Sequence, residues 1–397
     1  MKPFKLINQI QNYSWGSKDY IPELLGKNKN DKHWAELWMG DHPRATSTAV
    51  LDSENLPLNQ LIRNYSNDIL GEDTSRFGTQ LPFLFKVLSA MSPLSIQAHP
   101  DKIQAEEGFL DENLRKIPLD AFNRNYKDNN HKPEIICALT PFTAMCGFRD
   151  AKEIEANFLK LKSSVFVEKI QSVCVNNKEN WIKSFFSAYM LLENKYLSSL
   201  IESALEWAVS DNSLEAELLR KFAEYYNNDP GILAPLFLNV YKLQPGEALY
   251  QGPGELHAYV EGTGIELMSN SDNVLRGGLT PKYVDVEELL KVLNFNTSEK
   301  NVLKPVENES GSFVYSTPSD EFVLGYLKIK NSKSIETKNR KSLEILLCTS
   351  GEVVLSYENE TIPFIRGESL FIPASVKSYT LKGAGEIFSA GIPRKRK

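Results

Sequence analysis

The sequence predicts a mainly β protein with one α-helical insert, built from two antiparallel β-barrel (jelly-roll) domains. Three observations lead to this fold class. The 397-residue chain has 20 prolines and 22 glycines, yet neither residue occurs between Gly147 and Pro230. On both sides of that stretch, short β-branched and aromatic runs alternate with turn residues, as in antiparallel sandwiches and barrels. In addition, two strings in the first β region have counterparts in the second.

The stretch without glycine or proline carries apolar residues at the three- and four-residue spacing of amphipathic helices. This spacing predicts helices over 154–166, 180–209 and 213–226, with Asn and Asp-Asn-Ser breaks between them. We therefore assign residues 149–229 to a helical insert.

The repeated strings relate the two β regions to each other. GEALYQGPGELHAY over 246–259 is similar to GESLFIPASVKSY over 367–379 if one residue is skipped. EIICAL, which starts at Glu134, is similar to EILLCT, which starts at Glu344. In this alignment the second copy carries Lys377 where the first carries a histidine.

The spacing of the repeats shows where the helices interrupt the first copy. Glu134 and His257 are 257 − 134 = 123 residues apart, whereas Glu344 and Lys377 are 377 − 344 = 33 apart. The difference of 90 is close to the length of the helical stretch. This predicts a discontinuous first β domain over 1–148 and 230–300, the insert over 149–229, and a second, degenerate β domain over 301–397.

Composition excludes several classes of protein. The net charge of -6 argues against a broad nucleic-acid surface, since phosphate backbones are bound by positive patches. The N-terminal residues lack the apolar core of a signal peptide, and no later run is long enough to span a bilayer. The four cysteines lie far apart or within apolar strings, which predicts reduced core residues. We expect a cytoplasmic protein with no membrane or nucleic-acid partner.

LSIQAHPDK places polar residues at the end of an apolar run, where core packing does not require them. Side chains alternate along a strand, so Ser95, Gln97 and His99 share one face, with Gln97 and His99 about 6 to 7 Å apart. Pro100 ends the strand, which places these residues at a barrel mouth. In HKPEIICAL the same alternation groups Lys132 with Glu134.

His257 begins the strand HAYV after a Gln-Gly-Pro-Gly turn, with Tyr259 on its own side. Two imidazoles, one carboxylate and one amide carbonyl form a four-ligand set suited to zinc, with a position open for substrate or water. Each histidine could instead be a structural residue. Glu134 needs a partner in either case, because an unpaired buried carboxylate is costly.

Two further features follow His257. Arg276 lies in NVLRGG, which we interpret as a loop whose backbone can approach a ligand closely, although an exposed loop arginine is the alternative. Asp285 and Glu288 form a capping-box pattern that predicts a short helix over VEELLKVL.

Several rare strings occur together in the chain: NYSWGS, AELWMGDHPRA, SIQAHPDK, HKPEI, GELHAY and SDNVLRGGLTPK. In this order they closely resemble the type I phosphomannose isomerases, zinc-dependent enzymes of the cupin superfamily. The resemblance covers roughly residues 1 to 290. Beyond that, only the pattern of short strands supports it.

The resemblance implies two cupin-like domains and one Zn²⁺ per chain, held by Gln97, His99, Glu134 and His257. It also implies that Arg276 is catalytic. The family further places residues with less agreed roles around the substrate: Lys86, Ser95, Lys132, Tyr259 and Glu266. The implied partner is a small sugar phosphate, and we expect a monomer.

The implied reaction interconverts mannose 6-phosphate and fructose 6-phosphate by proton transfer through an enediol(ate). Glu266 and Lys132 are both candidates for the base. Arg276, Lys86 and Ser95 are candidates for holding the phosphate. A cupin dioxygenase is an alternative, although a fourth protein ligand such as Gln97 argues against it. A noncatalytic sugar-binding cupin is another.

Overall fold

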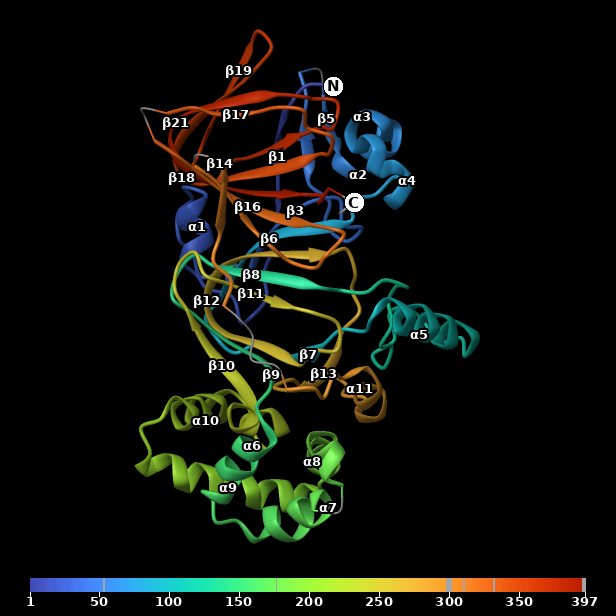
Figure 1. Cartoon of the computed structure of the whole chain (residues 1–397), viewed down its shortest axis with the longest axis vertical. Coiled ribbons are helices and arrows are strands. Elements are labelled where there is room, and N and C mark those ends of the chain that lie inside the picture. Colours follow the sequence, from blue (N-terminus) through green and yellow to red (C-terminus); the bar gives the residue numbers. More distant parts are fainter. Residues whose placement is uncertain (53, 176, 298–301, 310, 331–332, 395–397) are drawn as a thin grey trace.

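The computed structural model describes residues 1–397 apart from 53, 176, 298–301, 310, 331–332 and 395–397. The molecule is elongated, with three regions along its long axis (Figure 1). A sheet formed largely by C-terminal strands lies at one end, a second sheet lies in the middle, and a group of helices lies at the other end.

The middle sheet has ten strands in the described part of the chain, with the main order β10-β9-β12-β6-β3-β2. Its strands are β2 (Gln9–Gln11), β3 (Glu36–Met39), β6 (Phe83–Ala90), β7 (Ile96–Ala98), β8 (Glu134–Ala138), β9 (Phe142–Phe148), β10 (Leu238–Leu243), β11 (Ala248–Gln251), β12 (His257–Ser269) and β13 (Leu275–Gly278). The long strand β12 pairs with β6 and β8 through its C-terminal half, and with β7 and β9 through its N-terminal half.

The other sheet has eleven strands among the described residues, with the main order β14-β15-β16-β21-β18-β20-β1-β4-β5. Its strands are β1 (Phe4–Ile7), β4 (Thr48–Val50), β5 (Asn55–Pro57), β14 (Val306–Glu309), β15 (Ser312–Tyr315), β16 (Val323–Ile329), β17 (Ile335–Thr337), β18 (Glu344–Tyr357), β19 (Glu360–Ile365), β20 (Ser369–Ile372) and β21 (Tyr379–Gly391). The N-terminal segment therefore contributes strands to both sheets, which the sequence did not indicate.

The helices in the described residues are α1 (Tyr20–Leu24), α2 (Leu58–Asn64), α3 (Ser66–Leu70), α4 (Thr74–Phe77), α5 (Lys102–Leu114), α6 (Ala151–Leu159), α7 (Ser172–Cys174), α8 (Trp181–Met190), α9 (Asn194–Ser210), α10 (Leu214–Tyr225) and α11 (Val286–Val292). Three segments form 3₁₀ helices, η1 (Gly71–Asp73), η3 (Lys178–Asn180) and η4 (Pro230–Leu236), and η2 (Phe166–Gln171) is a π-helix. Helices α6 to α10 form the group at the end of the molecule (Figure 1).

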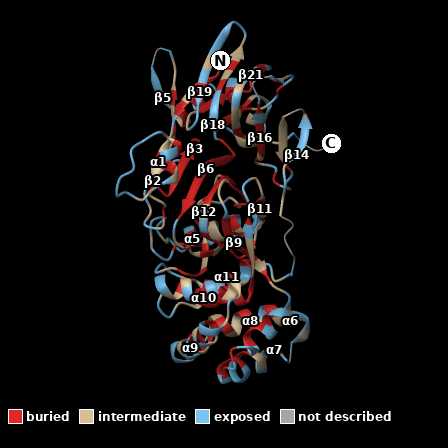
Figure 2. Ribbon diagram, turned by 90° about the vertical axis from the view of Figure 1, so that its left-hand side faces the viewer, coloured by how far each residue is buried: buried red, intermediate tan, exposed pale blue. Residues whose placement is uncertain are grey.

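The strand pairs between described residues are antiparallel, which confirms the mainly β prediction with helices between the β regions. The pairing order does not by itself close either sheet into a barrel. The two sheets share an apolar core, in which Phe4 of β1 stacks on Phe371 of β20 with ring centroids 5.1 Å apart. Figure 2 shows β3 and β6, which lie against this core, as buried throughout.

The predicted helices differ from the observed ones in two places. The segment 154–166 does not stay helical, because α6 ends at Leu159 and Lys162 adopts a φ of 51°. That left-handed conformation cannot continue a right-handed helix. The segment 180–209 divides into α8 and α9, since Glu193 is extended with a ψ of 143°. Neither break is marked by glycine or proline.

The repeated strings adopt the same strand pairing in both sheets. In the middle sheet β8 pairs with β11, and Glu134 lies opposite Gln251. In the other sheet β18 pairs with β20, and Glu344 lies opposite Ile372. Both glutamates begin their strands, so the sequence similarity corresponds to equivalent structural positions.

In the second copy, the glutamate that corresponds to Glu134 is paired with an arginine. The Arg340 guanidinium lies 3.2 Å from the Glu344 carboxylate, which also accepts a hydrogen bond of 2.7 Å from the Tyr379 hydroxyl. The ammonium of Lys377, aligned with His257, donates to the Ala374 carbonyl instead. The positive charge near Glu344 is thus supplied by the protein itself.

Two smaller predictions are also tested. Within the described residues, no helix is both long and apolar enough to cross a membrane. Cys137, Cys146, Cys174 and Cys348 are all buried, as predicted for core residues.

Candidate metal centre

His99, Glu134 and His257 come together at one end of the middle sheet. His99 follows β7 directly, Glu134 is the first residue of β8, and His257 is the first residue of β12. Their ligand atoms lie within 4.8 Å of one another. His99 Nε2 is 3.5 Å from one Glu134 oxygen, and His257 Nε2 is 3.3 Å from the other.

Backbone carbonyls fix the orientation of both imidazoles. His99 Nδ1 lies 2.7 Å from the Asn273 carbonyl oxygen, and His257 Nδ1 lies 2.8 Å from that of Glu255. Because a carbonyl only accepts, each Nδ1 must carry the proton and donate it. In a neutral ring, Nε2 then keeps a lone pair directed at Glu134, which is the arrangement of a metal-binding histidine.

The ionisation states also suit a cation. His99 Nε2, His257 Nε2 and Glu134 Oε2 are buried and have no hydrogen-bond partner among the described residues. Burial lowers the pKa of His99 to about 4, which keeps it neutral. Burial acts to raise the pKa of Glu134, but Lys132 and His99 outweigh it and hold that pKa well below its usual range. A neutral His99 imidazole and an ionised Glu134 carboxylate fit a divalent ion such as zinc.

Strand register brings Gln97 and Arg276 beside the triad. Gln97 lies opposite His257 in the β7–β12 pair, and Arg276 lies opposite Gln97 in the β7–β13 pair. Residues directly opposite in antiparallel strands point to the same face. The interpretation of Arg276 as a loop residue was wrong, because it lies in β13 (Leu275–Gly278). Its register partner is about 180 residues away, so no local pattern marks the strand.

Arg276 is half-buried, and burial lowers its pKa. No carboxylate pairs with its guanidinium within the part of the chain that the structure describes. A partly desolvated guanidinium with free donors beside a metal-binding triad is suited to holding an anionic ligand.

Lys132 is fixed by Glu134. Its ammonium lies 2.8 Å from the Glu134 oxygen that faces His99. As a proton acceptor, Lys132 would first have to break this ion pair. As a cation it balances the carboxylate and adds positive charge at the edge of the centre.

A second buried charged cluster lies on the same face of the sheet. The Lys86 ammonium is 2.8 Å from Glu266 and 3.6 Å from Glu36, and all three side chains are buried. The indole of Trp38 donates to Glu36 over 2.8 Å. Burial raises the pKa of Glu266, against the opposing effect of Lys86. Burial disfavours the charged form of Lys86, but Glu266 and Glu36 outweigh this effect and raise the pKa of Lys86.

The two remaining predicted site residues differ in position. The Tyr259 ring centroid lies 6.2 Å from that of His257, and its buried hydroxyl makes no hydrogen bond among the described residues. Ser95 is half-buried immediately before β7. No hydrogen bond or ion pair within the described residues links Ser95 to the triad.

Sequence reasoning missed several residues that support this centre. Asn273, whose carbonyl holds His99, is itself fixed by hydrogen bonds from its amide to the Asp128 and Asn130 carbonyls. Glu36, the second carboxylate at Lys86, lies in the string AELWMGDHPRA but was not predicted to be a site residue. The SDN string could have indicated Asn273, because Asx residues commonly fix irregular backbone near a site.

The helix after this segment forms as predicted, with half of the expected cap. The Asp285 side chain accepts from the Glu288 backbone at the start of α11. The Glu288 carboxylate does not complete the box; it accepts from the Tyr126 hydroxyl instead.

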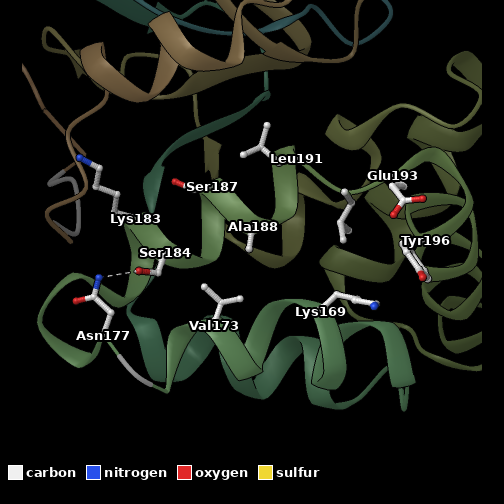
Figure 3. Close-up of a pocket in the computed structure, with 11 residues that line it drawn as sticks. Lys169, Val173, Asn177, Lys183, Ser184, Ser187, Ala188, Leu191, Glu193 and Tyr196 are labelled. Atoms are coloured by element: carbon white, nitrogen blue, oxygen red, sulfur yellow. Dashed lines mark hydrogen bonds between the residues drawn. The ribbon is translucent and has the colours of Figure 1, made fainter.

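A separate cavity of about 590 Å³ lies among the helices, far along the chain from the triad. Figure 3 shows Lys169, Val173, Ser184, Ala188 and Tyr196 around it. None of the predicted site residues lines this cavity, so its size does not bear on the metal centre.

Comparison with known proteins identifies similar sequences over nearly the whole chain. Residues 3–151 match the family "Phosphomannose isomerase type I, catalytic domain", and residues 313–390 match "Mannose-6-phosphate isomerase, cupin domain". Mannose-6-phosphate isomerase of Escherichia coli K12 is 38% identical over 96% of this chain and 98% of its own length. The human protein of that name is 34% identical over 96% and 95%.

Solved structures show the same likeness. A phosphomannose isomerase variant from Salmonella typhimurium superposes with a TM-score of 0.92 at 36% identity, covering 99% of this chain and all of that one. A zinc-bound mannose 6-phosphate isomerase superposes with a TM-score of 0.91, at the same identity and coverage.

Proposed function

The chain belongs to the type I phosphomannose isomerase family, and on that premise we propose that it is a zinc-dependent isomerase of mannose 6-phosphate and fructose 6-phosphate. Gln97, His99, Glu134 and His257 bind one Zn²⁺ in this proposal. Zinc is named in a similar solved structure. Here it would act as a Lewis acid that stabilises negative charge on a substrate oxygen.

One observation carries the proposal: three buried ligand atoms face each other without partners. Leaving a single buried polar atom unpaired costs about 1–3 kcal/mol. If His99 Nε2, His257 Nε2 and Glu134 Oε2 all stayed unpaired, they would together destabilise the folded state. A divalent cation satisfies all three at once.

Aldose–ketose isomerisation moves a proton between C1 and C2, next to a carbonyl. The enzyme must provide a base and must stabilise the enediolate. Of the two candidate bases, we favour Glu266, because burial raises its pKa above the ordinary value, which makes the carboxylate a stronger base. Lys132 is committed to its ion pair with Glu134.

Arg276 stabilises the anionic ligand in this proposal. It is half-buried and has no carboxylate partner among the described residues, whereas Lys86 is neutralised by Glu266 and Glu36. We therefore assign Arg276 to the oxyanion or the phosphate, and Lys86 to holding Glu266 in place. Tyr259 contributes a hydroxyl to the sugar, and Ser95 remains a candidate for the phosphate.

The domain assignment belongs to the same proposal. We propose a catalytic cupin domain over 1–148 and 230–300, a helical insert over 149–229, and a second cupin domain over 301–397, in a cytoplasmic monomer. The match of 313–390 to a cupin domain supports the third part. Mass measurement in solution tests the monomer.

The function is tested by coupling fructose 6-phosphate formation to a dye-linked assay with the purified protein. The proposal predicts turnover of mannose 6-phosphate, loss of turnover after chelation, and recovery with zinc. It also predicts about one zinc per chain by metal analysis, lost in His257→Ala. Turnover that survives complete removal of metal would refute it.

A further inference from the structure

A cluster of unpartnered polar atoms extends beyond the three metal-facing ones. The described residues contain eight buried side-chain atoms without a hydrogen-bond partner. Six of these belong to His99, Glu134, His257, Tyr259 and Gln251. An ion accounts for the first three residues, and Tyr259 faces the sugar in the proposed function. Gln251 is left without a role, although both its amide atoms lack a partner.

Strand register places Gln251 next to Glu134. The two residues lie directly opposite in the antiparallel β8–β11 pair. Their side chains therefore share a face, with Cβ atoms about 4.5–5.5 Å apart. No hydrogen bond joins the two side chains in this structure. Gln251 is only 1% exposed, so bulk water does not satisfy its amide.

The order of the strands indicates whether Gln251 acts on the metal ligand or on the substrate. β11 lies at the outer side of β8, whereas Glu266 and Lys86 lie on β12 and β6 at the other side. Glu266, the proposed base, therefore lies across Glu134 from Gln251. This favours a role on the metal ligand over contact with the substrate.

The second copy of the fold shows that the position does not require an amide. Ile372 occupies the equivalent place opposite Glu344 and is fully buried. An apolar residue thus fits this site in the strand. A glutamine there leaves two buried polar atoms unpaired, a cost that points to a function.

We propose that Gln251 is a positioning residue of the metal centre: its amide, which has no hydrogen-bond partner in this structure, donates to the Glu134 carboxylate when the ion is bound and holds it in its ion-binding orientation. The Lys132 ammonium, from the segment just before β8, lies 2.8 Å from the same carboxylate. This inference rests on the proposed zinc site. Outer-shell partners of this kind commonly contribute about 10–100-fold in metal affinity.

The test is the zinc dissociation constant of Gln251→Met, measured by chelator competition on the full chain. We expect zinc binding to weaken about 10-fold or more. The metal-free variant should unfold at the same or a higher temperature than metal-free wild type, because an unpaired buried amide is removed. At saturating zinc, KM for the sugar phosphate should not change. A residue with only a packing role would instead lower the unfolding temperature.

Leu249→Met is the matched control, since Leu249 lies on the same strand and face but opposite Ile136. It should bind zinc as wild type does. Gln251→Leu, which imitates the branched residue of the second copy, should behave as Gln251→Met does. An unchanged zinc affinity in both Gln251 variants, or an equal loss in Leu249→Met, would overturn the inference. If wild type itself binds no zinc, the proposed function fails instead.

Discussion

Replacing Lys86 with methionine removes the one cation held between two buried carboxylates. At an effective dielectric constant of about 20, its attraction to Glu266 at 2.8 Å is about 6 kcal/mol, and that to Glu36 at 3.6 Å is about 5 kcal/mol. Methionine keeps most of the aliphatic stem, so the change is mainly electrostatic. The two carboxylates would then repel each other in a buried site.

Proton uptake limits the resulting loss of stability. A glutamate of ordinary pKa 4.5 takes up a proton at pH 7 at a cost of about 3.4 kcal/mol, since each pH unit is worth about 1.36 kcal/mol. Binding of one proton returns the cluster to the net charge that it has when Lys86 is present. At pH 5 the same protonation costs only about 0.7 kcal/mol. Lys86→Met should thus lose about 3 kcal/mol of unfolding free energy at pH 7 and about 1 at pH 5.

Urea unfolding of the zinc-loaded protein at the two pH values measures this difference, with wild type as the reference at each pH. The double variant Lys86→Met with Glu266→Gln supplies the neutral side chain in advance. Its loss should therefore not depend on pH. The reasoning is refuted if Lys86→Met loses the same free energy at pH 5 and pH 7, or less than about 1 kcal/mol at pH 7.

Three further predictions concern single residues. Burial raises the pKa of Asp41 to about 7, above its unfolded value of 3.8, so the folded state binds the proton more tightly and loses stability as pH rises between these values. Asp41→Asn, which can still accept from the Leu81 amide, should raise the unfolding temperature at pH 8 by an amount corresponding to up to about 4 kcal/mol; a lower temperature would contradict this. Arg276→Lys keeps the charge but not the planar fork, so we expect kcat to fall about 100-fold with zinc content unchanged, and wild-type kcat would exclude the proposed role. Glu266→Gln should lower kcat by about 10²-fold or more and abolish the acidic limb of the pH–rate profile, whereas an unaltered limb would point to another base.

The β regions and the three converging ligands could be predicted because each leaves a local trace. Because side chains alternate along a strand, Gln97 and His99 lie on one face. The turn before His257 indicates that a strand starts there. The similarity between the strings that start at Glu134 and Glu344 could also be recognised in the sequence. It reflects the structure, because both glutamates begin strands at equivalent places in the two sheets.

What the sequence did not reveal depends on contacts between distant segments. Arg276 belongs to a strand only because β7 pairs with it. Glu36 and Lys86 meet across neighbouring strands, and Gln251 faces Glu134 from 117 positions further along the chain. The break between α8 and α9 has no glycine or proline, so the helical periodicity of the sequence predicted one continuous helix there.

Anomalous scattering at the zinc edge, from crystals of the zinc-loaded protein, tests the central claim most directly. We predict one strong peak per chain, about 2.0–2.2 Å from His99 Nε2, His257 Nε2 and a Glu134 oxygen. The Gln97 amide oxygen should complete the set. Crystals of active protein that show no peak among these three side chains, or a peak only elsewhere, would contradict the account.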